Sequence, residues 1–112
     1  MIGIRAEHVE PAELVHKFAV ERDLRGVTRA AFEGPAAPPP YWHEMADMGW
    51  LGLHVAEEYG GSGFGLEELL VVVEQLGRAA AGGPLVTTCT ASALLAAVGP
   101  AALRAELLPG LV

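Results

Sequence analysis

The chain has 112 residues, a length that suits a single domain built around one hydrophobic core. Hydrophobic residues make up 52% of it and charged residues 19%, a composition that excludes an intrinsically disordered chain. Fourteen acidic and seven basic residues give a formal net charge of -7, which argues against nucleic acid and against an anionic membrane surface as partners.

The sequence shows no sign of export or of a membrane span. Acidic residues follow the first five residues at once, so the apolar run of a signal peptide is missing. The single cysteine, Cys89, cannot form an internal disulfide, and we expect a cytoplasmic protein. Residues 79–103 carry no charge, but glycine and proline at 82–84 and 99–100 divide them into pieces shorter than the roughly 20 residues of a membrane span.

The first third of the chain predicts one helix that begins at Pro11 and ends near Gly34. Proline suits the first turn, where its missing N–H costs no hydrogen bond. Gly26 weakens this helix by about 1 kcal/mol relative to alanine. The apolar stripe of the helix consists of Leu14, Phe18, Val20, Leu24, Val27 and Ala31.

A proline-rich loop separates this helix from the next. Residues 34–40 include four prolines and predict an extended loop within the domain. A short helix over 41–48 follows, and Gly49 ends it. The apolar run over 50–55 predicts either a brief extended segment or a buried turn.

The second half predicts three further helices. The clearest spans 66–78, where apolar residues recur at helical spacing and glutamates occupy the first turn, favourably for the helix dipole. Another spans 84–98 and has no charged side chain, and the last runs from 100 or 101 to 108 and ends at Pro109. We therefore expect residues 1–112 to form one all-α domain, an orthogonal or up-down bundle of about five helices.

The uncharged helix at 84–98 is unusual for so small a chain. A helix that is apolar on every side is normally enclosed on every side, and 112 residues provide too little protein for this. The chain also ends on Leu111 and Val112 without a polar tail. We therefore expect that the polypeptide, or a partner, continues beyond Val112 and covers this helix.

The glycine-rich loop at 60–65 does not match a phosphate-binding motif. A dinucleotide fingerprint G-x-G-x-x-G would need glycine where Leu66 or Glu68 stands, and a P-loop would need lysine at Leu66. A nucleophile elbow around Ser62 fails at Phe64. The loop instead fits a tight connection whose glycines allow positive φ and close packing.

No residue pattern predicts a catalytic or metal-binding site. His43, Glu44 and Asp47 resemble the zinc motif H-E-x-x-H, but aspartate replaces the second histidine, and we expect a solvated helix face. Cys89 lacks a nearby cation to lower its pKa, so we expect it to be packed rather than nucleophilic. The paired glutamates are sequence neighbours whose side chains point in different directions, so neither pair predicts a catalytic dyad.

One series of motifs is more specific than any of these. The chain reads WHEMADMGWLGL over 42–53, EEYGGSG over 57–63, LEEL over 66–69, EQLGR over 74–78 and GP at 83–84. In this order and spacing, the series resembles the N-terminal helical domain of the acyl-CoA dehydrogenases. The resemblance covers nearly the whole chain and is strongest over 41–108. Ala56 departs from it by replacing the proline that usually precedes the paired glutamates.

The resemblance implies a place in a three-domain flavoenzyme. That family has an N-terminal helical domain, a middle β-domain and a C-terminal helical domain. FAD lies between the middle and C-terminal domains and the neighbouring subunit, and a glutamate in the C-terminal part removes the α-proton of the acyl-CoA. The middle and C-terminal domains are absent from residues 1–112, so this chain alone is expected to be inactive. The implied partners are acyl-CoA, the remaining dehydrogenase domains or subunits, electron-transferring flavoprotein and further copies in an oligomer.

The resemblance also implies where a fatty or steroid acyl group would lie. In the family, the helix matching 84–98 lines the cavity for the acyl tail, and this indicates as substrate-binding candidates Leu85, Val86, Cys89, Thr90 and Ala93. The same residues equally suit the core of a buried helix. Two other functions stay open: a non-catalytic helical subunit that binds a separate flavoprotein chain, and a small bundle that binds a hydrophobic ligand between its helices.

Overall fold

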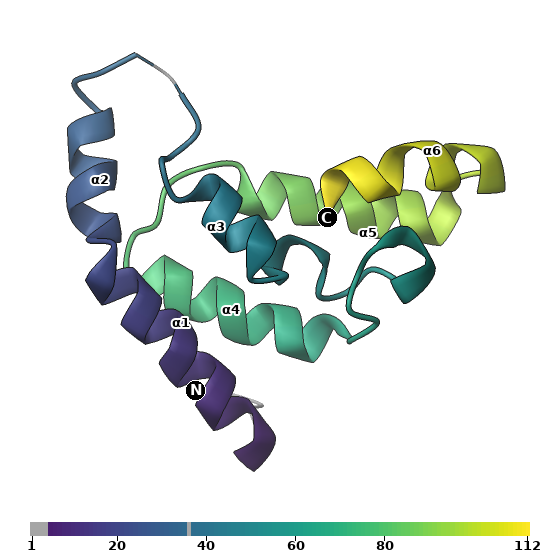
Figure 1. Cartoon of the computed structure of the whole chain (residues 1–112), viewed down its shortest axis with the longest axis horizontal. Helices are drawn as coiled ribbons and strands as arrows, with labels where there is room; N and C mark the ends of the chain where they lie inside the picture. The colour runs from purple at the N-terminus through teal and green to yellow at the C-terminus, as the bar shows by residue number, and fades with distance from the viewer. Residues whose placement is uncertain (1–4, 36) are drawn as a thin grey trace.

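A break divides the first predicted helix into two. The computed structural model describes residues 5–35 and 37–112, and in it α1 spans Val9–Glu21 and α2 spans Leu24–Ala31 (Figure 1). Between them Asp23 has a left-handed backbone with φ of 47°, and its side chain accepts a hydrogen bond from the Gly26 N–H. The prediction of a single helix is therefore wrong, because the aspartate caps a new helix instead of continuing the old one.

Gly26 makes this cap possible. A Cβ atom at its position would overlap the carboxylate of Asp23, so any other residue would displace the capping group. The glycine that weakens a continuous helix is thus the residue that allows a second helix to start here.

The remaining helices follow the predicted order. The α-helices are α3 at Trp42–Asp47, α4 at Leu66–Arg78, α5 at Leu85–Val98 and α6 at Ala101–Leu111, and the 3₁₀ helices are η1 at Ala6–His8, η2 at Trp50–Gly52 and η3 at Glu57–Tyr59. The described residues contain no strand, so the all-α class is confirmed, with six α-helices where about five were expected. The loop over 34–40 is non-helical as predicted, although Ala36 lies outside the described residues, and the run over 50–55 is a buried turn.

The last helix continues through Pro109, where the sequence predicts a stop. Proline has no N–H to donate, so the final turn of α6 lacks one backbone hydrogen bond. The preceding turns keep theirs. Leu108 is fully buried, and Val112 packs directly against Gly52, where an added Cβ would lie 2.8 Å from Cβ of Val112. Tertiary contacts therefore hold the end of α6, and the predicted stop is wrong.

The glycine-rich loop closes tightly on its own beginning. Gly60 and Gly63 have positive φ values of 92° and 69°, and a Cβ on Gly61 would overlap the carbonyl group of Val55. The Gly63 N–H donates to the Val55 carbonyl at 2.9 Å. The loop is therefore the closely packed connection that its glycines predict.

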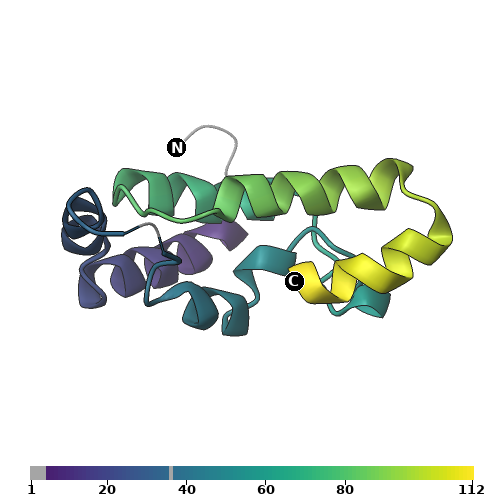
Figure 2. The ribbon, with the colours of Figure 1, turned by 90° about the horizontal axis from the view of Figure 1, so that it is seen from above.

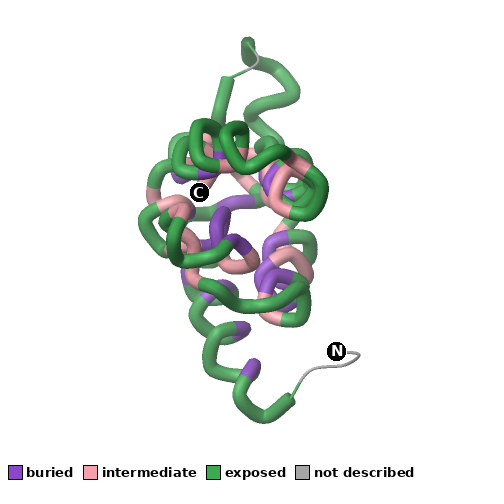
Figure 3. Tube along the Cα trace, turned by 90° about the vertical axis from the view of Figure 1, so that its right-hand side faces the viewer, coloured by how far each residue is buried: buried purple, intermediate pink, exposed green. Residues whose placement is uncertain are grey.

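The core lies where α1, α3, η2, α4 and the start of α5 meet. Figure 3 shows several buried stretches in the middle of the body and exposed ones around its outside. Phe18 packs edge-to-face on Trp50 and Tyr41, with ring centroids 5.0 and 6.3 Å apart. The buried Tyr41 hydroxyl donates to the Gly82 carbonyl at 3.2 Å and accepts from the Gly82 N–H at 3.1 Å. The core thereby positions the segment that leads into α5.

The helices form a flat body of 41 × 39 × 21 Å. Figure 2 shows α4 and α5 along one side, with α1, α3 and α6 packed beneath them. Among the described residues, no helix combines the length and the hydropathy needed to cross a membrane. In the same view, the described residues place no other helix against the outer side of α5.

Asp23→Ala is expected to destabilise the domain by about 1–2 kcal/mol, because alanine lacks the capping oxygen and is strained at positive φ. Asp23→Gly is expected to cost roughly a few tenths of a kcal/mol, because glycine adopts this backbone freely. Urea unfolding followed by circular dichroism measures both values. Equal losses in the two variants would contradict the assignment of the break to Asp23.

Candidate functional site

α5 is anchored on one side and open on the other. Its buried side is formed by Leu85, Cys89 and Ser92. Elsewhere around the helix the apolar side chains of Val86 and Val98 are 60% and 73% exposed. The described residues therefore leave part of the uncharged helix open, as expected for a chain too short to enclose it.

The structure divides the five predicted substrate-binding residues between these two sides. Leu85 and Cys89 belong to the hydrophobic core. Val86, Thr90 and Ala93 are exposed, and their spacing of four and three residues places them on one helix face. Only these last three are placed to meet a ligand or another protein surface.

The exposed side of α5 is apolar even though it contains threonine. Thr90 Oγ1 donates to the Val86 carbonyl at 2.7 Å, and Thr87 Oγ1 donates to the Pro84 carbonyl at 3.1 Å. Both hydroxyl protons are therefore used within the helix. Because residues 79–103 also carry no charged side chain, this side matches an apolar ligand or an apolar protein surface.

Cys89 is packed, as its surroundings in the sequence predict. The thiol is buried, and Sγ lies 3.9 Å from the Leu51 carbonyl. Burial raises the pKa of the Cys89 thiol, which disfavours the thiolate that a nucleophile needs. The prediction that Cys89 is packed in the interior is confirmed.

A small cavity of about 120 Å³ lies at the start of α5. Leu85 and Val86 border it, together with Met45 and Val73. At about 30 Å³ for each water-sized group, it holds about four such groups, far fewer than a long acyl tail contains. This cavity is therefore too small to enclose a long acyl tail.

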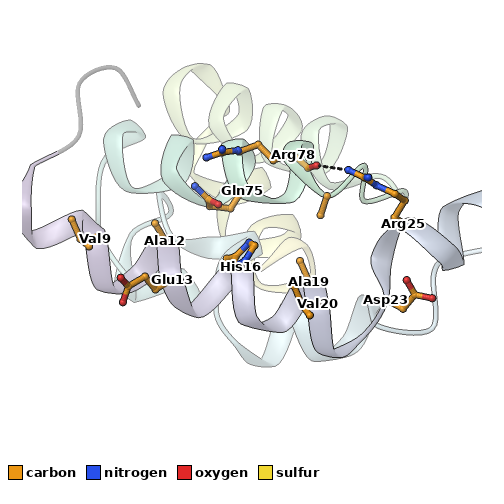
Figure 4. A pocket seen from close by; sticks show the side chains of 11 residues that line it. Val9, Ala12, Glu13, His16, Ala19, Val20, Asp23, Arg25, Gln75 and Arg78 are labelled. Atoms are coloured by element: carbon orange, nitrogen blue, oxygen red, sulfur yellow. Dashed lines mark hydrogen bonds between the residues drawn. The ribbon is translucent and has the colours of Figure 1, made fainter.

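A larger groove of about 670 Å³ lies where α1, α2 and α4 meet (Figure 4). Arg25 donates to the backbone carbonyl of Arg78 at 3.2 Å. Its positive charge thereby stabilises the C-terminal end of α4. Glu13 and Asp23 add two negative charges to these two positive ones, so the groove favours neither sign of ligand. Sequence reasoning missed this groove because it forms only once the chain breaks at Asp23.

A cluster of His8, Glu67 and Glu68 was not predicted either. Its possible ligand atoms lie within 4.8 Å of one another. His8 Nδ1 accepts the Arg5 N–H at 3.2 Å, so the neutral ring carries its proton on Nε2, 3.6 Å from Glu68 Oε1. The Arg5 guanidinium pairs with Glu67 at 3.2 Å. These contacts tie η1 to α4, and Nε2 in this state has no lone pair for a metal.

The zinc-like sequence at 43–47 forms a helix face in which Glu44 has another partner. His43 and Asp47 are exposed, as expected for a solvated face. The Arg22 guanidinium contacts the Glu44 carboxylate at 2.7–3.1 Å, and these hydrogen bonds lower the pKa of Glu44. The pair joins the end of α1 to α3.

Comparison with known proteins decides the family. The family model described as "Acyl-CoA dehydrogenase, N-terminal domain" matches residues 5–112. The chain belongs to this family. The resemblance carried by the motif series is thereby confirmed, and the acyl-CoA dehydrogenase domain has the expected helical fold.

The curated relatives are much longer than this acyl-CoA dehydrogenase domain. Acyl-CoA dehydrogenase FadE12 of Mycobacterium tuberculosis and fadE12 of Mycobacterium bovis are each 42% identical to it over 53 residues. That segment covers 47% of this chain and 13% of each relative. No solved structure is a significant match.

The division of the predicted site can be tested on two adjacent residues. Leu85→Ala is expected to cost about 2–4 kcal/mol, because it opens a cavity in the core. Val86→Ala is expected to change stability by less than about 0.5 kcal/mol, because its side chain is exposed. Urea unfolding of both variants measures the difference, and a larger loss for Val86→Ala would mean that α5 is rotated from the orientation described.

Proposed function

We propose that this domain forms one wall of the acyl pocket in an FAD-dependent acyl-CoA dehydrogenase. The observation that carries the proposal is the exposed, uncharged side of α5 with Val86, Thr90 and Ala93. An apolar surface of this kind suits a hydrocarbon tail or an adjoining domain. Membership of the acyl-CoA dehydrogenase family supports the proposal, because it supplies a substrate class with such a tail.

The contribution of this wall is binding and orientation. Dehydrogenation of an acyl-CoA removes a proton from the α-carbon and a hydride from the β-carbon, so both must be held in a fixed geometry. An apolar wall along the tail excludes water and limits the positions that the tail can take. The side chains of Val86, Thr90 and Ala93 would act in this way without taking part in the chemistry.

The residues of this wall do not fit a site for FAD. The pyrophosphate of a dinucleotide calls for cationic side chains or free hydrogen-bond donors. Residues 79–103 carry no charged side chain, and the hydroxyl protons of Thr87 and Thr90 are used within the helix. We assign FAD, which supplies the hydride acceptor, and the base that removes the α-proton to parts of a complete dehydrogenase outside this domain.

The structure favours this function over a free-standing ligand carrier. The cavity of about 120 Å³ is too small for a long tail, and the groove of about 670 Å³ is flanked by four charged residues. A non-catalytic subunit that binds a separate flavoprotein chain would use the same side of α5. In that alternative the flavin is bound to a separate polypeptide and not to the polypeptide that contains this domain.

Purification of the native protein with an antibody against this segment tests the proposal. We expect a polypeptide several times heavier than 11.7 kDa that carries flavin, and we expect acyl-CoA to bleach the flavin absorbance. A flavin-free species near 11.7 kDa would contradict the proposal. A chain of that mass associated with a separate flavin-bearing polypeptide would favour the non-catalytic subunit.

The wall itself is tested by placing a charge on it. In the native flavin-bearing protein, Ala93→Asp is expected to raise the KM for acyl-CoA at least about tenfold, because an apolar tail would have to desolvate a carboxylate. Val20→Asp is the matched control, since Val20 is also exposed but lies on α1. Steady-state kinetics with both variants give the comparison, and equal KM values would exclude α5 from the acyl pocket.

A further inference from the structure

We infer that His54 is a positioning residue that holds α5 in its rotational setting. It lies half-buried in the turn that follows η2, and its Nε2 is 3.0 Å from the backbone carbonyl of Cys89 in α5. The role of His54 does not depend on the proposed function. Only the identity of what binds to the exposed side of α5 rests on it.

The hydrogen bond determines where the ring proton of His54 lies. A carbonyl oxygen only accepts, so Nε2 must carry the proton and donate it. Within the described part of the chain, His54 Nδ1 is buried without a hydrogen-bond partner. The neutral imidazole therefore uses its one N–H on α5.

Cys89 is joined to the η2 turn by a second contact. Its thiol lies 3.9 Å from the carbonyl of Leu51, while its own carbonyl accepts from His54. A backbone carbonyl lies along the helix axis, whereas a side chain leaves the helix sideways. Together the two contacts oppose sliding and rotation of α5 at one residue.

Such a contact is needed because hydrophobic burial alone does not select the rotation of α5. Apolar residues are distributed almost evenly around this helix, and it has no charged side chain. A rotation by one residue, about 100°, would bring Val86 to the place that Leu85 now occupies and move Leu85 out of the core. Hydrogen bonds depend on direction and therefore favour one rotational position of α5 over the others. Burying one aliphatic side chain instead of another changes the free energy only slightly.

The single cysteine of the chain makes the test direct. Because Cys89 is buried, its alkylation by iodoacetamide without denaturant reports how often α5 separates from the η2 turn. His54→Leu removes the donor. His54→Gln keeps an N–H near the position of Nε2, whereas His54→Asn places one near the position of Nδ1.

We expect alkylation to be roughly fivefold faster in His54→Leu and His54→Asn than in the natural chain, and unchanged in His54→Gln. His43→Leu, which removes an exposed histidine of α3, is the control and is expected to leave the rate unchanged. An unchanged rate in His54→Leu, or a rate in His54→Gln as fast as in His54→Leu, would overturn the inference.

The test does not depend on the leucine variant folding. If circular dichroism shows that His54→Leu is unfolded, the glutamine and asparagine variants decide the question by the same rates. In the natural chain, ¹⁵N NMR of the imidazole is expected to show the proton of neutral His54 on Nε2. A proton on Nδ1 instead would overturn the inference without any variant.

These measurements use the chain itself and need neither flavin nor acyl-CoA. Failure of the acyl-wall proposal would therefore leave the alkylation rates as predicted. Unchanged rates in every variant would remove the role of His54 and leave the proposed wall to be judged by the Ala93→Asp kinetics.

Discussion

Edge-to-face packing of Phe18 against Trp50 and Tyr41 is the contact on which the rest of the arrangement depends. It brings together α1, the residue before α3 and the first residue of η2. Aromatic pairs of this geometry contribute about 0.5–1.5 kcal/mol beyond the area that they bury. Tyr41 connects this aromatic cluster to Gly82 through two hydrogen bonds, shortly before α5 begins. The segment that leads into α5 is thus tied to an aromatic cluster formed by the first half of the chain.

The two sides of α5 have different roles although they have similar composition. Its inner side completes the core through Leu85 and Cys89. Its outer side leaves apolar side chains in contact with water, which is unfavourable in an isolated chain and favourable where another surface covers them. The proposed acyl wall explains why the helix has no charge on either side, because a charged outer side would have to be desolvated when the pocket forms.

Several charged residues of the domain fasten the ends of its helices. Asp23 caps α2, Arg25 bonds to the end of α4, and Arg22 joins the end of α1 to Glu44 of α3. The network of Arg5, His8 and the glutamates of α4 does the same at the start of the chain. These charged contacts join separate helices and lie away from the exposed side of α5.

Local sequence is sufficient for the helices over 66–78 and 84–98, because their apolar spacing and their flanking glycine and proline act within a few residues. The collinear motifs over 41–108 were likewise sufficient for the family. The break at Asp23 was not predicted, because one capping side chain outweighed a continuous apolar stripe. The stop expected at Pro109 was wrong, because packing of Leu108 and Val112 holds the final turn.

The outward face of α5 could not be derived from sequence. A helix with apolar residues all around it and no charges has no pattern that distinguishes its sides, so Leu85 and Val86 are equivalent in the sequence, whereas in the structure one is buried and the other exposed. The groove between α1 and α4 and the cluster around His8 depend equally on residues from separate helices. Local periodicity decides where the chain is helical, whereas the orientation of a uniformly apolar helix is decided by directional contacts from its neighbours.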